Sequence, residues 1–294
     1  MVGTEDERPR ILADSARPTP TTGADDVVAA LVASTRAALD EAGRTLRDIA
    51  AVGCSAPGPL DHERGVVHVA PNIPGFENVP LAARLAAGLD GVPVFVDRDT
   101  IIAAIGEGAV GAARGVRDFV YVTVSTGVGG GIVAGGRIVR GATNTAGEIG
   151  HWPVALDGPP CGCGSFGCVE AFAGGHSLAE RYGARDAGDV FRAADEGDER
   201  ARGLVAGLES AMEALAVGLV NVLNPSLIVV GGGIAEHEPR HVLDPMRRGA
   251  RERAFAVASA AVRIVPAALG ADVGMIGAVV TARQRAAGRD PLSV

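Results

Sequence analysis

Residues 147–170 read GEIGHWPVALDGPPCGCGSFGCVE, and this stretch decides more about the chain than any other. It contains three of the four cysteines, Cys161, Cys163 and Cys168, and His151 lies ten residues before the first of them. One imidazole and three thiolates are the ligand set of a closed tetrahedral zinc site. The intervening glycines let the backbone turn tightly enough for three sulfurs to converge. We therefore predict a zinc ion held by these four residues.

A disulfide is the alternative explanation of the cysteines. Three is an odd number for disulfide pairing, and Cys161 and Cys163 are too close to pair without strain. No secretory signal opens the sequence, so a reducing cytoplasm is the expected compartment. The fourth cysteine, Cys54, lies alone in an apolar run and is predicted to be a small buried hydrophobe. Zinc is the favoured prediction.

Two carboxylates, Glu148 and Glu170, bracket the cluster. A metal ion that only stabilised a loop would not need them. We therefore expect the same feature to hold a substrate.

Composition limits the class of protein and its partners. The 294 residues are 47% hydrophobic and 21% charged, as in a globular protein with a real core. The net charge of −8 opposes binding to nucleic acid or to an anionic membrane. The longest apolar region, residues 211–235, is interrupted by Glu213, Asn221, Asn224 and Pro225. It is therefore predicted to be a helix followed by a strand, and no membrane span is expected.

Hydrophobic periodicity predicts alternating helices and strands, which is typical of an α/β fold with two lobes. Residues 177–202 are polar and helix-forming, and we expect them to be a solvent-exposed excursion. Strands are expected at residues 49–55, 66–69, 92–96, 119–125, 131–134 and 227–230, and helices at residues 22–43, 81–88, 100–111, 206–223 and 274–287.

Two glycine-rich segments follow apolar strands. The first reads STGVGGG from Ser125 to Gly131, and residues 126–130 are predicted to connect the two strands of a hairpin. Backbone N–H groups in such a turn can converge on a phosphate. The second is Gly231-Gly232-Gly233, placed where α/β folds bind nucleotides. Each segment has an equally simple structural explanation, because glycines also serve positions with positive φ.

Asp97-Arg98-Asp99 ends the strand predicted at residues 92–96, where the carboxyl end of a sheet meets its ligand. A carboxylate there can take a proton from a substrate hydroxyl during phosphoryl transfer. The alternative role is a helix N-cap, and two neighbouring aspartates can serve both roles. The histidines outside the cluster, His176, His237 and His241 among them, carry little weight as ligands.

These segments resemble the ROK family of bacterial sugar kinases and sugar-responsive regulators, with the glucokinase branch most similar. The matching segments are residues 56–61 (APGPLD), 71–76 (PNIPGF), 125–131, 147–151 (GEIGH) and the Cys-x-Cys-Gly-x-x-Gly-Cys-x-Glu signature. The resemblance runs from Ile11 to the C-terminus. It implies the actin/hexokinase-like ATPase fold, with ribonuclease H-like lobes at residues 1–105, joined by a C-terminal helix at 275–294, and at 106–274.

The resemblance also implies roles for individual residues. Asp99 would be the base that deprotonates the 6-hydroxyl of a sugar. Asn72, Glu148, His151 and Glu170 would bind its other hydroxyls, and His151 would use one ring nitrogen for zinc and the other for sugar. The zinc would be structural, because four protein ligands leave no open position. ATP, with Mg²⁺, would be bound by Thr126, Gly127, Gly129, Gly130, Gly231, Gly232 and Gly233.

Two departures from the family pattern stand out. The catalytic segment of the family reads Asn-Asp-x-Asn, whereas this chain has Arg98, Asp99, Thr100 and Ile101. The family also begins with a strand ending in Asp-x-Gly-Gly-Thr, but residues 1–10 are polar and turn-like, and Ile11–Ala13 resembles the third strand of the family. We expect about two strands to be missing, and we favour a true start further upstream over a decayed or repurposed relative.

Three hypotheses follow for function. The favoured one is a glucokinase-like enzyme that transfers phosphate from ATP to the 6-hydroxyl of a hexose, most simply glucose. The second is a sugar-binding regulator or pseudokinase that cannot use ATP; a DNA-binding repressor is disfavoured by the negative charge and by the lack of a winged helix. The third is an inactive fragment. We expect a homodimer or homotetramer, and the net charge of −8 predicts that neither nucleic acid nor a membrane is a partner.

Overall fold

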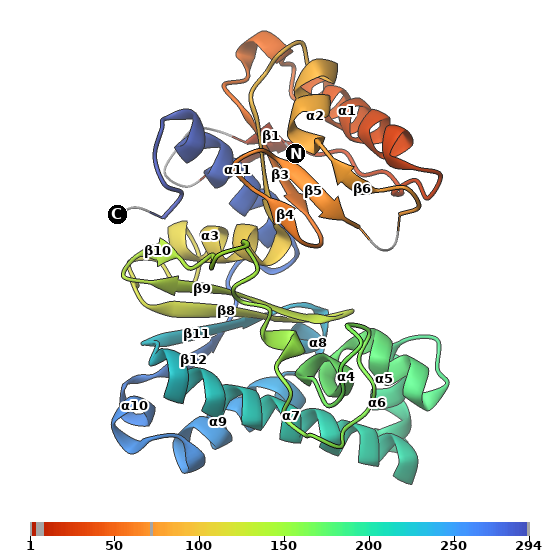
Figure 1. Cartoon of the computed structure of the whole chain (residues 1–294), viewed down its shortest axis with the longest axis vertical. Helices are drawn as coiled ribbons and strands as arrows, with labels where there is room; N and C mark the ends of the chain where they lie inside the picture. Colours follow the sequence, from red (N-terminus) through yellow and green to blue (C-terminus); the bar gives the residue numbers. More distant parts are fainter. Residues whose placement is uncertain (1, 4–8, 71–72, 293–294) are drawn as a thin grey trace. The chain divides into compact units, whose positions relative to one another are not determined.

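A computed structural model of the chain describes residues 2–3, 9–70 and 73–292. The chain forms two compact units, shown in Figure 1. Unit 1 comprises Met1–Arg114, Arg140–Ala146 and Ala271–Val294, and unit 2 comprises Gly115–Val139 and Gly147–Gly270. The mixed α/β class is confirmed by the alternation of helices and strands in both units. The lobe boundaries drawn from the sequence stay a prediction.

Unit 1 has a parallel strand pair at its centre. Strand β3 (Val52–Ala56) pairs with β7 (Val94–Arg98), and the neighbouring β4 (Leu60–Asp61), β5 (Val66–Val69) and β6 (Glu77–Val79) form a small antiparallel sheet. Helices α1 (Ala24–Glu41) and α2 (Leu81–Gly88) pack on these strands, with Leu81, Leu85 and Val96 in a shared core. Burial at Cys54 in β3 raises the pKa of its thiol to about 11, as expected of a cysteine that packs like a hydrophobe. Val2–Gly3 form strand β1 against β2 (Ile11–Ala13), so the turn-like prediction for residues 1–10 is wrong at that point.

The last helix closes unit 1 through glycines. Helix α11 (Val273–Ala286) packs against α3 (Asp99–Ala109) and β3. A Cβ at Gly277 would collide with the carbonyl oxygen of Ile102, and one at Gly53 would collide with that of Ala278. Neither glycine has a positive φ, so the missing side chain serves close packing of backbone on backbone.

Unit 2 is built on one five-stranded sheet in the order β10-β9-β8-β11-β12. Strands β8 (Phe119–Val124), β9 (Val128–Ala134) and β10 (Arg137–Ile138) form an antiparallel meander. Strands β11 (Leu227–Gly231) and β12 (Arg263–Pro266) run parallel to β8. The strand expected at residues 227–230 is confirmed, whereas β12 was not predicted because only four residues, one of them proline, carry its signal.

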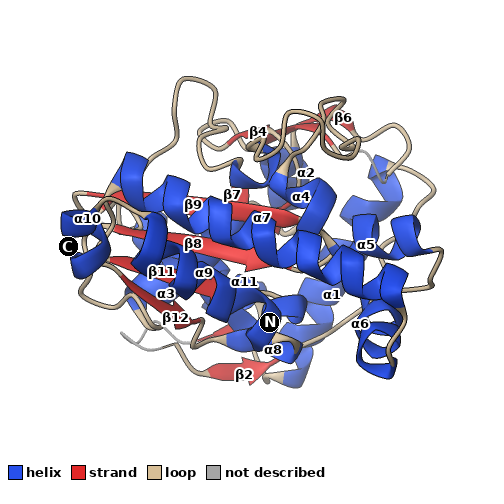
Figure 2. Cartoon of the chain, turned by 90° about the horizontal axis from the view of Figure 1, so that it is seen from below, coloured by secondary structure: helices blue, strands red, loops and turns tan. Residues whose placement is uncertain are grey.

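Helices α7 (Glu199–Leu223) and α9 (Pro239–Arg253) cover one face of this sheet, as Figures 1 and 2 show. By length and composition α7 passes as a membrane span. In the structure many of its apolar residues pack in the core of unit 2 and against α9, while Val222 and Leu223 are exposed. The chain then continues into β11, as the interrupted apolar pattern predicted. The core residues that α7 contributes include Leu208, Met212, Leu215 and Leu219.

The segment predicted to be a solvent-exposed excursion is instead part of unit 2. Residues 177–202 contribute to α5 (Gly175–Tyr182), α6 (Ala187–Glu196) and the first turn of α7. Leu178, Val190 and Phe191 are buried. The prediction was wrong because a helix with one narrow apolar stripe has a polar composition even when that stripe packs on a core.

A buried polar cluster ties the 140–146 segment to the end of β7. Arg140 donates two hydrogen bonds to Asp97, at 3.0 and 2.6 Å, and a third to Asn144 at 2.9 Å. The Asn144 side chain donates to the carbonyl oxygen of Leu60 at 3.0 Å. Asp97 is 1% exposed, so the guanidinium of Arg140 is needed to compensate the buried negative charge of its carboxylate.

We expect Arg140→Met to lower the free energy of unfolding by about 3 kcal/mol, because it leaves a buried carboxylate uncompensated. Urea unfolding measures this loss. The double variant Asp97→Asn/Arg140→Met should recover part of it, since the unpaired charge is then gone. Arg251→Met, which removes an exposed pair with Glu252, is the control and should change stability by less than about 1 kcal/mol. Equal losses in Arg140→Met and the control would contradict the assignment.

Candidate functional site

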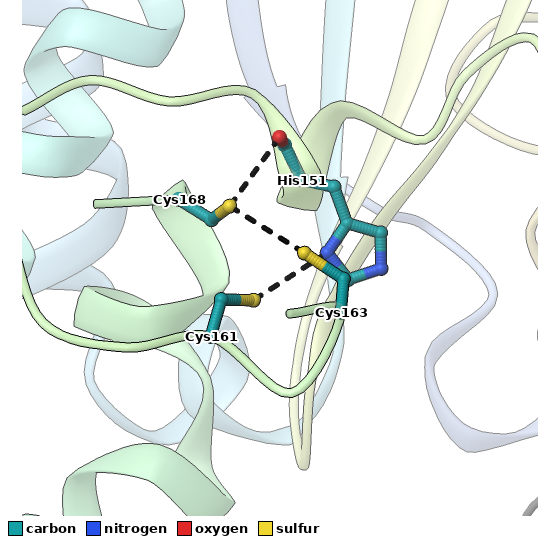
Figure 3. Close-up of side chains that lie close together, drawn as sticks. All are labelled: His151, Cys161, Cys163 and Cys168. Carbon is teal, nitrogen blue, oxygen red and sulfur yellow. Dashed lines mark hydrogen bonds between the residues drawn. The ribbon is translucent and has the colours of Figure 1, made fainter. Parts of the chain in front are cut away.

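The four residues predicted to hold zinc converge in unit 2 (Figure 3). Their ligand atoms all lie within 4.8 Å of one another. Cys163 Sγ and Cys168 Sγ are 3.8 Å apart, and Cys161 Sγ is 3.7 Å from His151 Nδ1. Thiolates bound at about 2.3 Å to a tetrahedral zinc ion are separated by about 3.8 Å, so the donor set and its spacing fit zinc. Nδ1 of His151 faces the sulfurs, and the other ring nitrogen points away from them.

The local backbone explains why the cysteines meet. Cys161 and Ser165 close a tight loop through an N–H to carbonyl bond of 2.8 Å. Gly164 and Gly167 have φ of 89° and 65°, which other residues rarely adopt. A Cβ at Gly167 would also collide with the carbonyl oxygen of Ala155. The glycines of the cysteine signature are therefore required by the turn that brings the sulfurs together.

Burial disfavours three thiolates in this loop without a cation. Desolvation raises the pKa of Cys161 to about 12 and also raises the pKa of Cys168, which has no exposed surface. A backbone hydrogen bond from Ser165 lowers the pKa of Cys163, which is exposed. A bound divalent cation would compensate the negative charge, and binding it would release the thiol protons.

The cysteine loop leads directly into the residue that contacts the first glycine-rich segment. Helix α4 (Val169–Ala173) begins one residue after Cys168, and Glu170 is in its first turn. Glu170 Oε2 accepts a hydrogen bond of 2.9 Å from the backbone N–H of Val128. The zinc ligands and the glycine-rich segment thus belong to one continuous structure.

The hairpin turn is shorter than the sequence predicted. It comprises Ser125–Gly127, whereas Gly129 and Gly130 are paired in β9 with Thr123 and Val122. A Cβ at Gly130 would come within 2.5 Å of Ile149 Cδ1, in the 3₁₀ turn Ile149–His151. The predicted connection over residues 126–130 is wrong because a glycine needed for close packing inside a strand looks the same as one in a turn. We call residues 125–128, which are the turn together with the first residue of β9, the glycine turn.

A cavity of about 480 Å³ opens beside the glycine turn. Of the predicted nucleotide residues, Thr126 and Gly233 line it; Gly231 ends β11, and Gly232 has φ of 94° directly before helix α8 (Gly233–His237). Sequence reasoning missed the lining residues that come from α5, α6, the connection between these helices and the end of α8. They include His176, Arg185, Asp186, Phe191, His237 and Glu238. Their only sequence signal is a polar helical composition, which is shared by any surface helix.

His241, to which the sequence assigned no role, is held behind the cavity wall. Its Nδ1 lies 2.6 Å from Glu209, and its ring stacks on Phe191 with centroids 5.5 Å apart. The charged stretch around it is helix α9, which supports α6 through Arg240 and Asp195 as well.

Asp99 lies in unit 1 as the first residue of α3, with Arg98 in the N-cap position. Its side chain is exposed, yet desolvation by the protein around it raises the pKa of Asp99 above the ordinary range. The backbone N–H of Thr100 donates to Asp99 at 2.7 Å, which lowers that pKa in part.

The residues that depart from the family pattern beside Asp99 are buried. Arg98 is 2% exposed and donates to the carbonyl oxygen of Ala146 at 2.6 Å, and Ile101 is buried in α3. Asn72, predicted to bind sugar, lies outside the described residues.

Comparison with known proteins identifies the family. A family model described as "ROK family" matches residues 1–285. The chain belongs to the ROK family. It is 35% identical to a glucokinase from Halalkalibacterium halodurans over 250 residues, which cover 78% of this chain and 75% of that protein.

Solved ROK structures share the fold. A ROK hexokinase from Thermus thermophilus is similar with a TM-score of 0.82 and 36% identity, covering 97% of this chain and 95% of that one. A ROK glucokinase from Streptomyces griseus, in complex with glucose and AMPPNP, is similar with a TM-score of 0.75 and 32% identity, covering 90% of each chain. These neighbours confirm the predicted actin/hexokinase-like ATPase fold of this ROK protein.

We expect the purified ROK protein to bind one zinc ion per chain through His151 and the three clustered cysteines. Cys168→Ser should lose the metal and lower the thermal unfolding midpoint, because the loop then lacks a buried ligand. Metal analysis by mass spectrometry and thermal melting measure both effects. Cys54→Ser, which removes the cysteine outside the cluster, is the control and should keep zinc. Full zinc content in Cys168→Ser would contradict the site.

The raised pKa of Asp99 predicts a pH-dependent effect on stability. A carboxyl whose pKa is raised by folding holds its proton more tightly in the folded protein, so ionisation above that pKa costs stability. Asp99→Asn cannot ionise and keeps an oxygen for the Thr100 N–H. It should therefore melt at a higher temperature than wild type at pH 7, with the difference shrinking as the pH falls towards 4. A variant that is less stable at pH 7 would contradict the shift.

Proposed function

We propose that this ROK protein is an ATP-dependent hexose kinase that phosphorylates the 6-hydroxyl of a sugar, with glucose as the expected substrate. One observation carries the proposal: Glu170 links the zinc-ordered loop to the glycine turn, beside a cavity of about 480 Å³. Glucokinases and a ROK hexokinase among the relatives support the same class of reaction.

In this proposal, unit 2 provides most of the groups that bind substrates. Glu148 and Glu170 accept hydrogen bonds from sugar hydroxyls, and the ring nitrogen of His151 that points away from the sulfurs contacts a further hydroxyl. Zinc keeps these side chains in place as a structural ion and has no open position for chemistry. Asn72 is proposed to add an amide contact to the sugar.

Bound ATP with Mg²⁺ would supply the phosphoryl group. Backbone N–H groups of Thr126 and Gly127 face its phosphates in our proposal, with Gly129 and Gly130 supporting the turn from β9. In our proposal the segment Gly231–Gly233 borders the adenosine of bound ATP, and Gly233 of this segment lines the cavity. The ROK glucokinase from Streptomyces griseus, whose structure is named with AMPPNP, supports ATP as the donor.

Asp99 is the proposed general base. It accepts the proton of the attacking hydroxyl as the phosphoryl group is transferred, a step that relies mainly on positioning and charge neutralisation. The raised pKa of Asp99 keeps this carboxylate more basic than an ordinary aspartate. Turnover should therefore fall in acid as Asp99 becomes protonated.

We further propose a cytoplasmic enzyme that assembles as a homodimer or homotetramer. The apolar helix α7 supports this location because many of its apolar residues pack inside unit 2. The acidic net charge of −8 supports the absence of a nucleic-acid partner.

We expect ADP release to depend on hexose when this chain, and a version extended upstream, are assayed with ATP and glucose, mannose or N-acetylmannosamine. Asp99→Asn should reduce kcat by roughly 10²–10⁴-fold because the base is lost. It should leave glucose binding, measured by calorimetry, within about threefold, since Asn keeps the hydrogen-bonding oxygen.

Absence of turnover in the extended version would overturn the kinase proposal, and glucose binding without turnover would favour the sugar-binding alternative. Loss of both turnover and glucose binding in Asp99→Asn would contradict the role of Asp99 as base.

A further inference from the structure

We infer that Glu170 is a positioning residue for the glycine turn, through which the zinc site controls nucleotide affinity even without sugar. The inference rests on the proposed function for its nucleotide part. The proposed function gives Glu170 a role in sugar binding alone and gives zinc a role in ordering the loop around it. The inference adds an effect of both on nucleotide binding.

The first support is the hydrogen bond between Glu170 and the turn. The N–H of Val128 donates to Glu170 Oε2 at 2.9 Å, and Val128 is 5% exposed. A buried N–H without an acceptor is costly, so the turn depends on this carboxylate. Within the part of the chain that the structure describes, Glu170 Oε1 accepts no hydrogen bond, which leaves one oxygen for a ligand.

The second support is the residue beside that bond. A Cβ at Gly127 would come within 2.5 Å of Glu170 Oε2. Gly127 does not have a positive φ, so its backbone conformation does not require glycine. A side chain at residue 127 would therefore have to displace the carboxylate from the position in which it accepts the Val128 hydrogen bond.

The third support is a pair of backbone bonds from the next helix. The N–H groups of Gly175 and His176 donate to the carbonyl oxygens of Ser125 and Thr126, at 2.8 and 2.9 Å. A Cβ at Gly175 would come within 2.9 Å of the same Ser125 oxygen. The beginning of α5 is therefore fixed to the turn that lines the cavity.

The zinc loop holds the other end of this connection. Cys168 and Pro153 pair through an isolated antiparallel β-bridge of the backbone. The Sγ of Cys168 also lies 3.4 Å from the carbonyl oxygen of His151. The N–H of Val169 donates to the carbonyl oxygen of Trp152 at 3.0 Å. Since Glu170 follows two residues after Cys168, a loop without metal would release the start of α4 and, with it, the carboxylate under the turn.

The test measures AMPPNP affinity by calorimetry in the absence of any sugar. Glu170→Ala should weaken binding about tenfold, because Val128 loses its buried acceptor. Glu170→Gln should stay within about threefold of wild type, since its amide oxygen can accept the same bond. Glu180→Ala, an exposed glutamate on α5, is the matched control and should bind as wild type does. A Glu170→Ala variant with unchanged affinity would overturn the inference.

Removal of zinc with a chelator tests the coupling. In wild type it should weaken AMPPNP binding about as much as Glu170→Ala does, and in Glu170→Ala it should add little, because both changes break one connection. Equal further weakening in both proteins would show that zinc acts by another route.

Amide exchange separates this inference from the proposed function. Without nucleotide, the Val128 amide should be protected in wild type and Glu170→Gln and lose protection in Glu170→Ala. Unchanged protection in Glu170→Ala would overturn the positioning role. If wild type bound no AMPPNP and turned over no hexose, the proposed kinase and the nucleotide part of the inference would both fall, and the exchange result would still decide the contact itself.

Discussion

Three thiols and one imidazole share a space in which all four ligand atoms lie within 4.8 Å of one another, and ionisation of those thiols calls for a compensating cation. Burial raises the pKa of Cys161 and Cys168, so the loop would resist forming thiolates without a cation. A bound cation would reverse that preference and stabilise the closed loop. Because α4 begins directly after Cys168, the position of Glu170 follows from the closed loop.

Glycines let the backbone segments around this loop pack in close contact with one another. A Cβ at Gly150 would collide with the carbonyl oxygen of Val128, and one at Gly130 would come within 2.5 Å of Ile149. The His151 segment therefore lies directly on β9, next to the glycine turn. In unit 1, Gly277 plays a similar part where α11 meets α3. Tight packing of backbone on backbone keeps polar groups in place that loose loops would leave mobile.

The prediction from sequence succeeded where the signal was local. The four predicted zinc ligands lie within eighteen residues, and their side chains converge in the structure as the spacing indicated, whereas zinc binding itself stays a prediction. Helix α2 and strand β5 lie where hydrophobic periodicity placed them. Such features need only neighbouring residues, so a single sequence is enough to find them.

The prediction failed where distant segments decide the outcome. The glycine turn was drawn too long, because pairing of Gly129 with Thr123 is a property of the hairpin and not of glycine itself. The structure pairs Asp97 with Arg140, forty-three residues away, and gives Arg98 the carbonyl oxygen of Ala146. Those partners come from a segment whose sequence carries no signal of their contact.

The sequence by itself determined the α/β class and the resemblance to the ROK family, and it predicted the four candidate metal ligands that converge in the structure, because each depends on short motifs or regular periodicity. Only the tertiary structure decided which residues line the cavity, since they come from α5, α6 and α8 and have no common motif. Only the structure showed that Glu170 contacts Val128, forty-two residues earlier in the chain. Hydrogen bonds between such distant residues depend on how whole elements pack, and packing is a property of the folded chain rather than of any one segment.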